Sequence, residues 1–96
     1  MSKPMKANTP PTLALVVPCY NEQQVMPVTA RTLRAEMQRL QAQGLISADS
    51  RIFFIDDGSK DNTWAIISEL AEQDTMYAGI KLARNYGHQY ALYAGL

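Results

Sequence analysis

Short apolar runs alternate with segments of helical periodicity along this chain. Residues 13–17 form a continuous apolar run that ends at Pro18, and residues 51–55 form a second run rich in aromatic and β-branched side chains. Uninterrupted apolar runs of this length are typical of strands that are buried on both faces of a parallel sheet. Residues 77–82 indicate a third strand.

The first segment between these runs predicts a helix over residues 23–43. Its apolar side chains recur near one face, at Met26, Leu33, Met37 and Leu40. Pro27 is compatible only with the first turn of such a helix, where a missing N–H has no intrahelical partner. Gly44 is a suitable stop after its last turn.

Two further helices are predicted downstream. Residues 63–73 carry apolar side chains at helical spacing, and Asp61 or Ser59 can cap their first turn. Residues 89–96 indicate a third helix. The predicted order is β-α-β-α-β-α, which specifies an α/β fold with a three-stranded parallel sheet, right-handed crossovers and helices packed on its faces.

The domain organisation follows from the same pattern. Residues 1–12 contain three prolines, two lysines and no apolar periodicity, so we expect a flexible tail there. Residues 13–96 form the folded part, and 96 residues allow one small domain at most. With 47% apolar and 19% charged residues, a packed core is expected.

Charge and cysteine content exclude several classes of protein. The formal net charge is zero and no run of Lys or Arg is interleaved with aromatic residues, which argues against a nucleic-acid partner. Cys19 is the only cysteine, so an internal disulfide is excluded and a reducing compartment such as the cytoplasm is expected. No apolar stretch approaches the ~20 residues that span a bilayer.

Polar side chains follow each predicted strand. These are residues 18–22, 56–59 and 84–88. Ligands of open α/β sheets bind outside the carboxyl ends of the strands, so the three clusters are the candidates for function.

In the first cluster, Tyr20, Asn21 and Glu22 bring an aromatic ring, an amide and a carboxylate to one turn. Such a set can stack against a nucleobase and bond its polar edge. The alternative, which local chemistry leaves open, is a turn whose Asn and Glu only cap the next helix.

The second cluster places Asp56 and Asp57 together after an apolar strand, with Asp61 close behind. Adjacent carboxylates suit ribose hydroxyls, base N–H groups or a metal ion. A simple capping loop is the alternative. Because two acids in this position repel each other, we favour a functional interpretation.

In the third cluster, Arg84 and Gly87 precede the third predicted helix and could approach a diphosphate. His88 lies in the same loop, and we interpret it as a solvated residue rather than a general base.

Taken together, residues 16–22 (VVPCYNE), 54–61 (FIDDGSKD) and 84–96 (RNYGHQYALYAGL) resemble the family 2 glycosyltransferases of GT-A fold. The third motif is most similar to the branch that moves a sugar from a nucleotide donor to a polyprenyl phosphate, as dolichyl-phosphate mannosyltransferases and bactoprenol glucosyltransferases do. The resemblance covers residues 13–96.

The resemblance implies a role for each matching position. Asp57 would bond the nucleobase, Asn21 and Asp56 would support its loop, and Arg84 would lie near the diphosphate. The complete set implied for nucleotide binding is Pro18, Tyr20, Asn21, Glu22, Ile55, Asp56, Asp57 and Arg84.

The resemblance also implies partners for the full-length protein. These are a nucleotide sugar of the UDP-glucose or GDP-mannose type, a lipid-phosphate acceptor, and Mg²⁺ or Mn²⁺, at the cytoplasmic face of the inner membrane. The metal-binding Asp-x-Asp motif of the family does not occur in these 96 residues. We therefore expect the isolated chain to hold no metal, to bind nucleotide weakly and to transfer no sugar, and its incomplete sheet predicts possible self-association.

Other classes fit less well. A receiver-like signalling module carries its acidic pair after the first strand, whereas here that strand ends in Pro18-Cys19-Tyr20. A dinucleotide-binding fold would require a G-x-G-x-x-G turn after the first strand, and this sequence has none. A non-catalytic nucleotide-binding protein remains an alternative to the enzyme.

Overall fold

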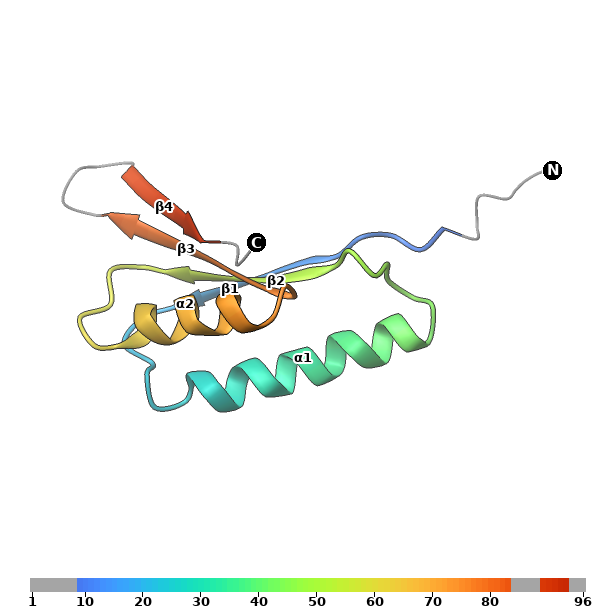
Figure 1. The fold of residues 1–96 in the computed structure, drawn as a ribbon, viewed down its shortest axis with the longest axis horizontal. Helices are drawn as coiled ribbons and strands as arrows, with labels where there is room; N and C mark the ends of the chain where they lie inside the picture. The colour runs from blue at the N-terminus through green and yellow to red at the C-terminus, as the bar shows by residue number, and fades with distance from the viewer. Residues whose placement is uncertain (1–8, 84–88, 94–96) are drawn as a thin grey trace.

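The computed structural model describes residues 9–83 and 89–93. Its sheet has the order β1-β2-β3-β4, and two helices pack beside it (Figure 1). The elements are β1 (Ala14–Cys19), α1 (Met26–Ala42), β2 (Arg51–Asp56), α2 (Thr63–Gln73), β3 (Tyr77–Ala83) and β4 (Gln89–Tyr93).

The first three strands are parallel, which confirms the predicted α/β class and its three-stranded parallel sheet. Each crossover steps in the same direction across the sheet, from β1 to β2 and from β2 to β3. Two crossovers of the same hand that step the same way place their helices on one face. Figure 1 shows α1 and α2 on that common face, and the described part of the chain places no helix on the other.

Strand β1 continues two residues beyond the predicted end. Pro18 pairs in register with Ile55, and Cys19 pairs with Asp56. Because β1 is the outer strand of this sheet, its far side makes no ladder bond in the described chain, and a proline without an N–H is tolerated there.

Both predicted signals that bound α1 are confirmed. Pro27 lies in the first turn. After the last turn, Gly44 adopts a left-handed conformation with φ +75°. The N–H of Gly44 donates to the Gln41 carbonyl at 3.0 Å, and that of Leu45 donates to the Leu40 carbonyl at 3.0 Å. This pair of bonds is a Schellman motif, which satisfies carbonyls that the helix leaves unpaired.

The third predicted helix, residues 89–96, is wrong over residues 89–93, and residues 94–96 lie outside the described residues. Gln89–Tyr93 forms strand β4, antiparallel to β3, with Leu92 opposite Ile80. A helix of eight residues gains too few hydrogen bonds to be stable by itself. The outer edge of β3 offers unpaired backbone groups, and the tyrosines of this segment favour a strand. Tertiary pairing therefore overrides the local periodicity.

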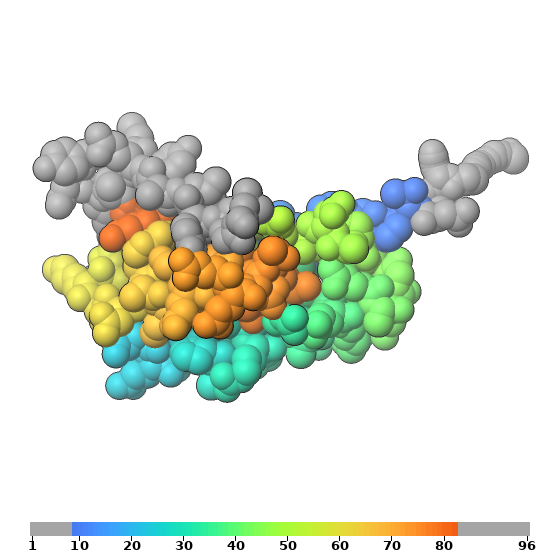
Figure 2. Space-filling model, in the orientation of Figure 1, coloured from blue at the N-terminus to red at the C-terminus, as the bar shows by residue number. Residues whose placement is uncertain are grey.

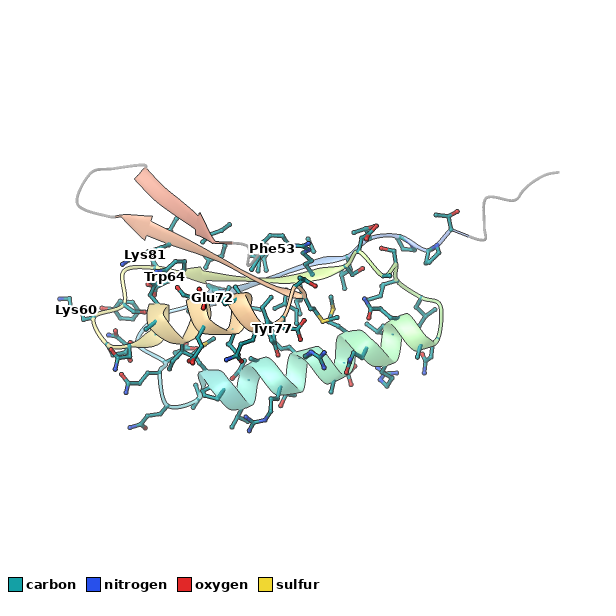
Figure 3. The ribbon with its side chains drawn as sticks, in the orientation of Figure 1. Phe53, Lys60, Trp64, Glu72, Tyr77 and Lys81 are labelled. Carbon is teal, nitrogen blue, oxygen red and sulfur yellow. The ribbon has the colours of Figure 1, made fainter. Side chains whose placement is uncertain are left out.

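The core lies between the sheet and the two helices. Ile52 and Phe54 of β2 are fully buried on the helix-covered face, and the Phe54 ring lies 5.8 Å from that of Tyr77 in β3. The Tyr77 hydroxyl donates to the Ala30 carbonyl of α1 at 2.9 Å, and Figure 3 shows Tyr77 between the sheet and that helix. Burial of its ring is the main cause that raises the pKa of Tyr77.

The two helices also contact each other directly, and Figure 2 shows them packed together along one side of the molecule. Arg34 of α1 forms an ion pair with Asp74, the C-cap residue that follows α2. Both side chains are partly exposed, so we expect a small contribution to stability from this pair.

The described chain begins against the α1–β2 loop. The Ser47 N–H donates to the Pro11 carbonyl at 2.8 Å, and the Thr12 and Ser47 hydroxyls are 2.7 Å apart. Residues 1–8 of the predicted flexible tail lie outside the described residues.

We expect Gly79→Ala to destabilise the fold, because a Cβ at this position of β3 would lie 2.5 Å from the Ile67 γ2 methyl and 3.1 Å from the Trp64 ring. Overpacking of this kind costs about 1–3 kcal/mol. Urea unfolding measures the loss. Leucine has no γ2 methyl, so Ile67→Leu in the same background should recover part of the loss. An unchanged unfolding midpoint for Gly79→Ala would contradict this account.

Candidate functional site

The loops that follow β1 and β2 leave the sheet side by side. Their strands are parallel and in register, so Cys19 lies opposite Asp56 at the carboxyl edge. The Asp57 N–H continues the ladder by donating to the Cys19 carbonyl at 3.0 Å. Two of the three predicted clusters are thereby brought together at one edge.

Asn21 connects the two loops through both its backbone and its side chain. Its N–H donates to the Ser59 hydroxyl at 2.8 Å, and its side-chain oxygen accepts the Lys60 N–H at 2.7 Å. The residue has φ +50°, a left-handed conformation that Asn tolerates better than most residues. These two bonds connect the loop after β1 to the loop after β2.

Gln23 and Asp61 make a second connection. The Gln23 N–H donates to Asp61 Oδ2 at 3.2 Å, and the Gln23 side-chain oxygen accepts the Asn62 N–H at 3.0 Å. A cavity of about 350 Å³ opens at this junction, lined by Asn21, Glu22, Gln23, Gln24, Val25 and Asp61. The hydrogen bonds between the two loops hold the Asn21, Gln23 and Asp61 parts of its wall in place.

Asp56 lies on the helix-covered face and is fully buried. Its Oδ1 accepts the Ser59 N–H at 3.2 Å, whereas its Oδ2 has no protein partner among the described residues. This contact holds the turn after β2, where Gly58 has φ +82°. The buried Asp56 carboxylate is therefore bonded within its own turn, and its role in nucleotide binding stays a prediction.

The opposite face of the sheet presents a different set of side chains at the same edge. Pro18 and Ile55 are neighbours in register. Pro18 is exposed and Ile55 half-buried, while Tyr20, just beyond the strand, is 49% exposed. Asp57 follows Ile55 directly and is half-buried. An apolar surface next to a carboxylate is suited to a flat, polar-edged ligand such as a nucleobase.

The third predicted cluster, Arg84 to His88, lies outside the described residues. Within residues 9–83 and 89–93, no group of three or more His, Cys, Asp or Glu side chains is placed to hold a metal ion. The described helices include none long and apolar enough to cross a membrane.

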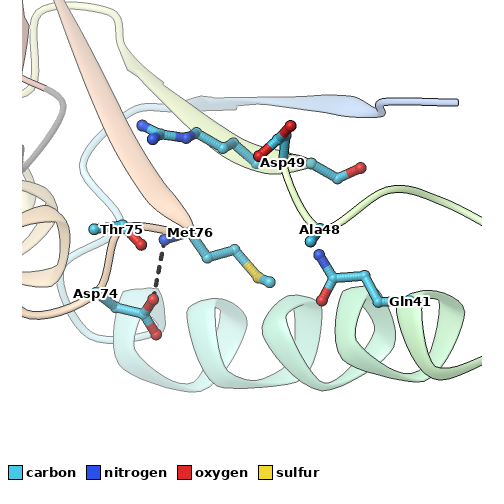
Figure 4. Close-up of a pocket in the computed structure, with 8 residues that line it drawn as sticks. Gln41, Ala48, Asp49, Asp74, Thr75 and Met76 are labelled. Atoms are coloured by element: carbon cyan, nitrogen blue, oxygen red, sulfur yellow. Dashed lines mark hydrogen bonds between the residues drawn. The ribbon is translucent and has the colours of Figure 1, made fainter.

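A second cavity lies at the opposite, amino edge of the sheet (Figure 4). Its volume is about 220 Å³, and Asp49, Arg51 and Asp74 are among the residues that line it. Asp74 is already occupied, because it accepts the Met76 N–H at 3.0 Å and pairs with Arg34. Parallel sheets bind ligands at the other edge, which argues against a ligand site in this cavity.

Thr63 is a residue of the site that the sequence interpretation missed. Its hydroxyl accepts the Glu22 N–H at 2.8 Å and donates to Asp61 Oδ1 at 2.5 Å, although the residue begins α2. The Asp61-x-Thr63 spacing suggested only a helix cap. The N-cap of α2 is Asn62, which makes no side-chain cap bond, so the cap predicted at Asp61 or Ser59 is wrong. Asp61 precedes the cap and accepts the Thr63 N–H at 2.9 Å.

A family model for glycosyl transferase family 2 matches residues 14–96. The chain is 48% identical over 86 residues to the uncharacterized glycosyltransferase YkoT of Bacillus subtilis and 40% identical over 84 residues to a prophage bactoprenol glucosyl transferase homolog of Escherichia coli. It is 33% identical over 84 residues to an undecaprenyl-phosphate 4-deoxy-4-formamido-L-arabinose transferase of Enterobacter.

These alignments cover 90%, 88% and 86% of this chain but 26%, 26% and 24% of the three relatives. The chain therefore spans about a quarter of the length of the curated relatives that it matches. No solved structure gave a significant match. The order of the described strands and helices up to β3 is consistent with the N-terminal part of a GT-A fold.

We expect the Cys19 thiol to be unreactive at pH 8. Burial is the main cause that raises its pKa from 9.0 to about 11, and the negative charges of Glu22 and Asp56 add to this. A shift of this size leaves about a hundredfold less thiolate than in the unfolded chain. Alkylation by iodoacetamide should be correspondingly slow in the native protein and should accelerate as the pH rises through about 11. Equal rates for native and urea-unfolded protein at pH 8 would contradict the assignment.

Asn21→Ala should destabilise the site more than Asn21→Gly does. Alanine loses the bond to the Lys60 N–H and tolerates the left-handed region less well than Asn, for a cost of about 1–3 kcal/mol. Glycine loses only the bond, and Asn21→Asp, which keeps an acceptor, is the conservative control. Denaturant unfolding of the three variants provides the test, and equal losses for alanine and glycine would exclude a role for the backbone conformation.

Proposed function

The chain belongs to glycosyl transferase family 2, and from this premise we propose that it is the nucleotide-binding part of an enzyme that transfers a sugar from a nucleotide donor to a polyprenyl phosphate. Two of its relatives carry names that specify bactoprenol or undecaprenyl phosphate. These names support a lipid-phosphate acceptor for the whole protein.

One observation carries the assignment to the nucleotide. The Tyr20–Glu22 turn and the Asp57 loop adjoin at the carboxyl edge of a parallel sheet, and the hydrogen bonds of Asn21 hold them together. A site that is already ordered loses less conformational entropy when a ligand binds. The arrangement is therefore suited to holding a small, rigid group.

We assign the nucleobase to the apolar surface of Pro18 and Ile55, with the Tyr20 ring beside it. A stacked base loses contact with water on its flat face and keeps its polar edge free for bonding. The Asp57 carboxylate, next along the chain from Asp56, would accept the N–H groups of that edge. Glu22 would complete the pocket from the β1–α1 loop, close to the ribose.

The identity of the base depends on the number of N–H donors that face Asp57. Uracil has one N–H group on its pairing edge, whereas guanine has adjacent donors at its ring nitrogen and its amino group. A carboxylate has two oxygens and can accept from either base. We propose a donor of the UDP-glucose or GDP-mannose type.

In the proposed reaction, an acceptor phosphate oxygen attacks the anomeric carbon of the sugar, and the bond to the nucleoside diphosphate breaks. The described residues contribute by fixing the nucleoside, which orients the anomeric carbon toward the acceptor. Mg²⁺ or Mn²⁺ is proposed for the whole protein and would neutralise the departing diphosphate. The described residues do not offer a cluster that fits this ion, so no step is derived through it.

The remaining proposals concern the surroundings of the enzyme. A polyprenyl phosphate is a membrane lipid and nucleotide sugars are water-soluble, so the reaction requires a site at the membrane surface. We propose the cytoplasmic face of the inner membrane. Arg84, outside the described residues, remains a proposal for the diphosphate side.

Titration of the ¹⁵N-labelled chain with UDP and with GDP, each with and without Mn²⁺, tests the nucleotide site. We expect amide shift changes centred on Tyr20, Glu22 and Asp57 for one of the two nucleotides. Asp57→Ala should weaken that binding about tenfold or more, since a charged acceptor is lost. Asp49→Ala, at the opposite edge of the sheet, is the matched control.

Two results would contradict the proposal. Shift changes that cluster around Asp49 and Asp74 would place the ligand at the amino edge. A folded spectrum that neither nucleotide perturbs would show that this chain does not form a nucleotide site by itself.

A further inference from the structure

The hydroxyl of Thr63 lies at the centre of a chain of hydrogen bonds. Thr63 is fully buried. Its hydroxyl has a single proton, which it donates to Asp61 Oδ1 at 2.5 Å. The oxygen is then free to accept only, and it accepts the Glu22 N–H at 2.8 Å. The carboxylate thus determines which way the hydroxyl points and what it can bind.

Glu22 occupies the point where the turn after β1 becomes the start of α1. Its carbonyl accepts the N–H groups of Val25 at 3.1 Å and Met26 at 3.0 Å. Its own N–H has Thr63 as its partner. Fixing this one residue therefore fixes the exit from the Tyr20 turn and the entry into the helix.

Asp61 acts on the same segment a second time. Its Oδ2 accepts the N–H of Gln23, the residue after Glu22, at 3.2 Å. Its Oδ1 also accepts the Thr63 N–H at 2.9 Å. One carboxylate thus accepts hydrogen bonds from both loops. Both of its oxygens are needed as acceptors, because each group that they contact is a hydrogen-bond donor.

We propose that Asp61 is the positioning residue of this site: acting through the Thr63 hydroxyl and the Gln23 N–H, it fixes the backbone of Glu22 in the conformation that receives the nucleoside. This inference rests on the proposed function and assigns a residue outside the set that the family motifs imply. The hydrogen bond from the Thr63 side chain is the main cause that holds the pKa of Asp61 below its usual range, so the carboxylate stays charged at neutral pH.

Amide hydrogen exchange of the chain without nucleotide is the first test. Thr63→Val has nearly the same shape but no hydroxyl, so the Glu22 amide should exchange about tenfold faster or more. Thr63→Ser restores the hydroxyl and should restore protection. Thr32→Val, at an exposed position of α1, is the matched control and should leave Glu22 unchanged.

Asp61→Asn tests the carboxylate itself. An amide can keep one acceptor toward Thr63, but its NH₂ group would then face the Gln23 N–H. We expect faster exchange at Gln23 and a smaller increase at Glu22. This partly exposed position should tolerate the change, so the test holds even if Thr63→Val fails to fold. Unchanged exchange at both amides in Asp61→Asn, or loss of Glu22 protection in Thr63→Ser, would overturn the proposal.

Nucleotide affinity separates this inference from the proposed function. If UDP or GDP binds, Thr63→Val should weaken binding about tenfold, and Thr63→Ser should retain the wild-type affinity. If Thr63→Val speeds amide exchange at Glu22 but keeps the wild-type nucleotide affinity, the positioning role alone is overturned. If neither nucleotide binds the wild-type chain, the proposed function fails, and the exchange data still decide whether Asp61 fixes Glu22.

Discussion

The parallel register between β1 and β2 determines where the candidate residues lie. Six residue pairs, from Ala14 with Arg51 to Cys19 with Asp56, bring both strands to the same carboxyl edge. Side chains alternate along a strand, so a shift of one residue would exchange the two faces of β2. Asp56 would then leave the core, and Ile55 would leave the face that it shares with Pro18. The polar loops can meet only because this register is kept.

Much of the fold could be predicted because its signals are local. The bounds of α2 follow from the spacing of its apolar side chains, and Pro27 and Gly44 act within one turn of α1. The segment from Gln89 to Tyr93 could not be predicted in this way. Eight residues of apparent helical spacing say nothing about a free strand edge nearby, and that edge decides the conformation.

For the candidate site, the sequence predicted which loops are involved but not all of the contacts between them. Ligands of open α/β sheets bind outside the carboxyl ends of the strands, and this rule pointed to the two clusters. The family motifs implied supporting roles for Asn21 and Asp56, whose bonds lie in these loops. The motifs did not reveal that the Thr63 hydroxyl bonds both Asp61 and Glu22, because Glu22 belongs to another loop. Contacts between loops depend on how the strands are placed, and a sequence pattern within one loop does not contain that information.

The separation along the chain of the bonded loop residues has a consequence for the order of assembly. The bonds of Asn21 to Ser59 and of Glu22 to Thr63 join residues 38 and 41 positions apart. Closing such a loop has an entropic cost that only the completed strand pair offsets. During synthesis, these bonds cannot form until Thr63 has emerged from the ribosome. The bonded carboxyl edge of the sheet is therefore a late product of folding, and slow strand pairing would delay it.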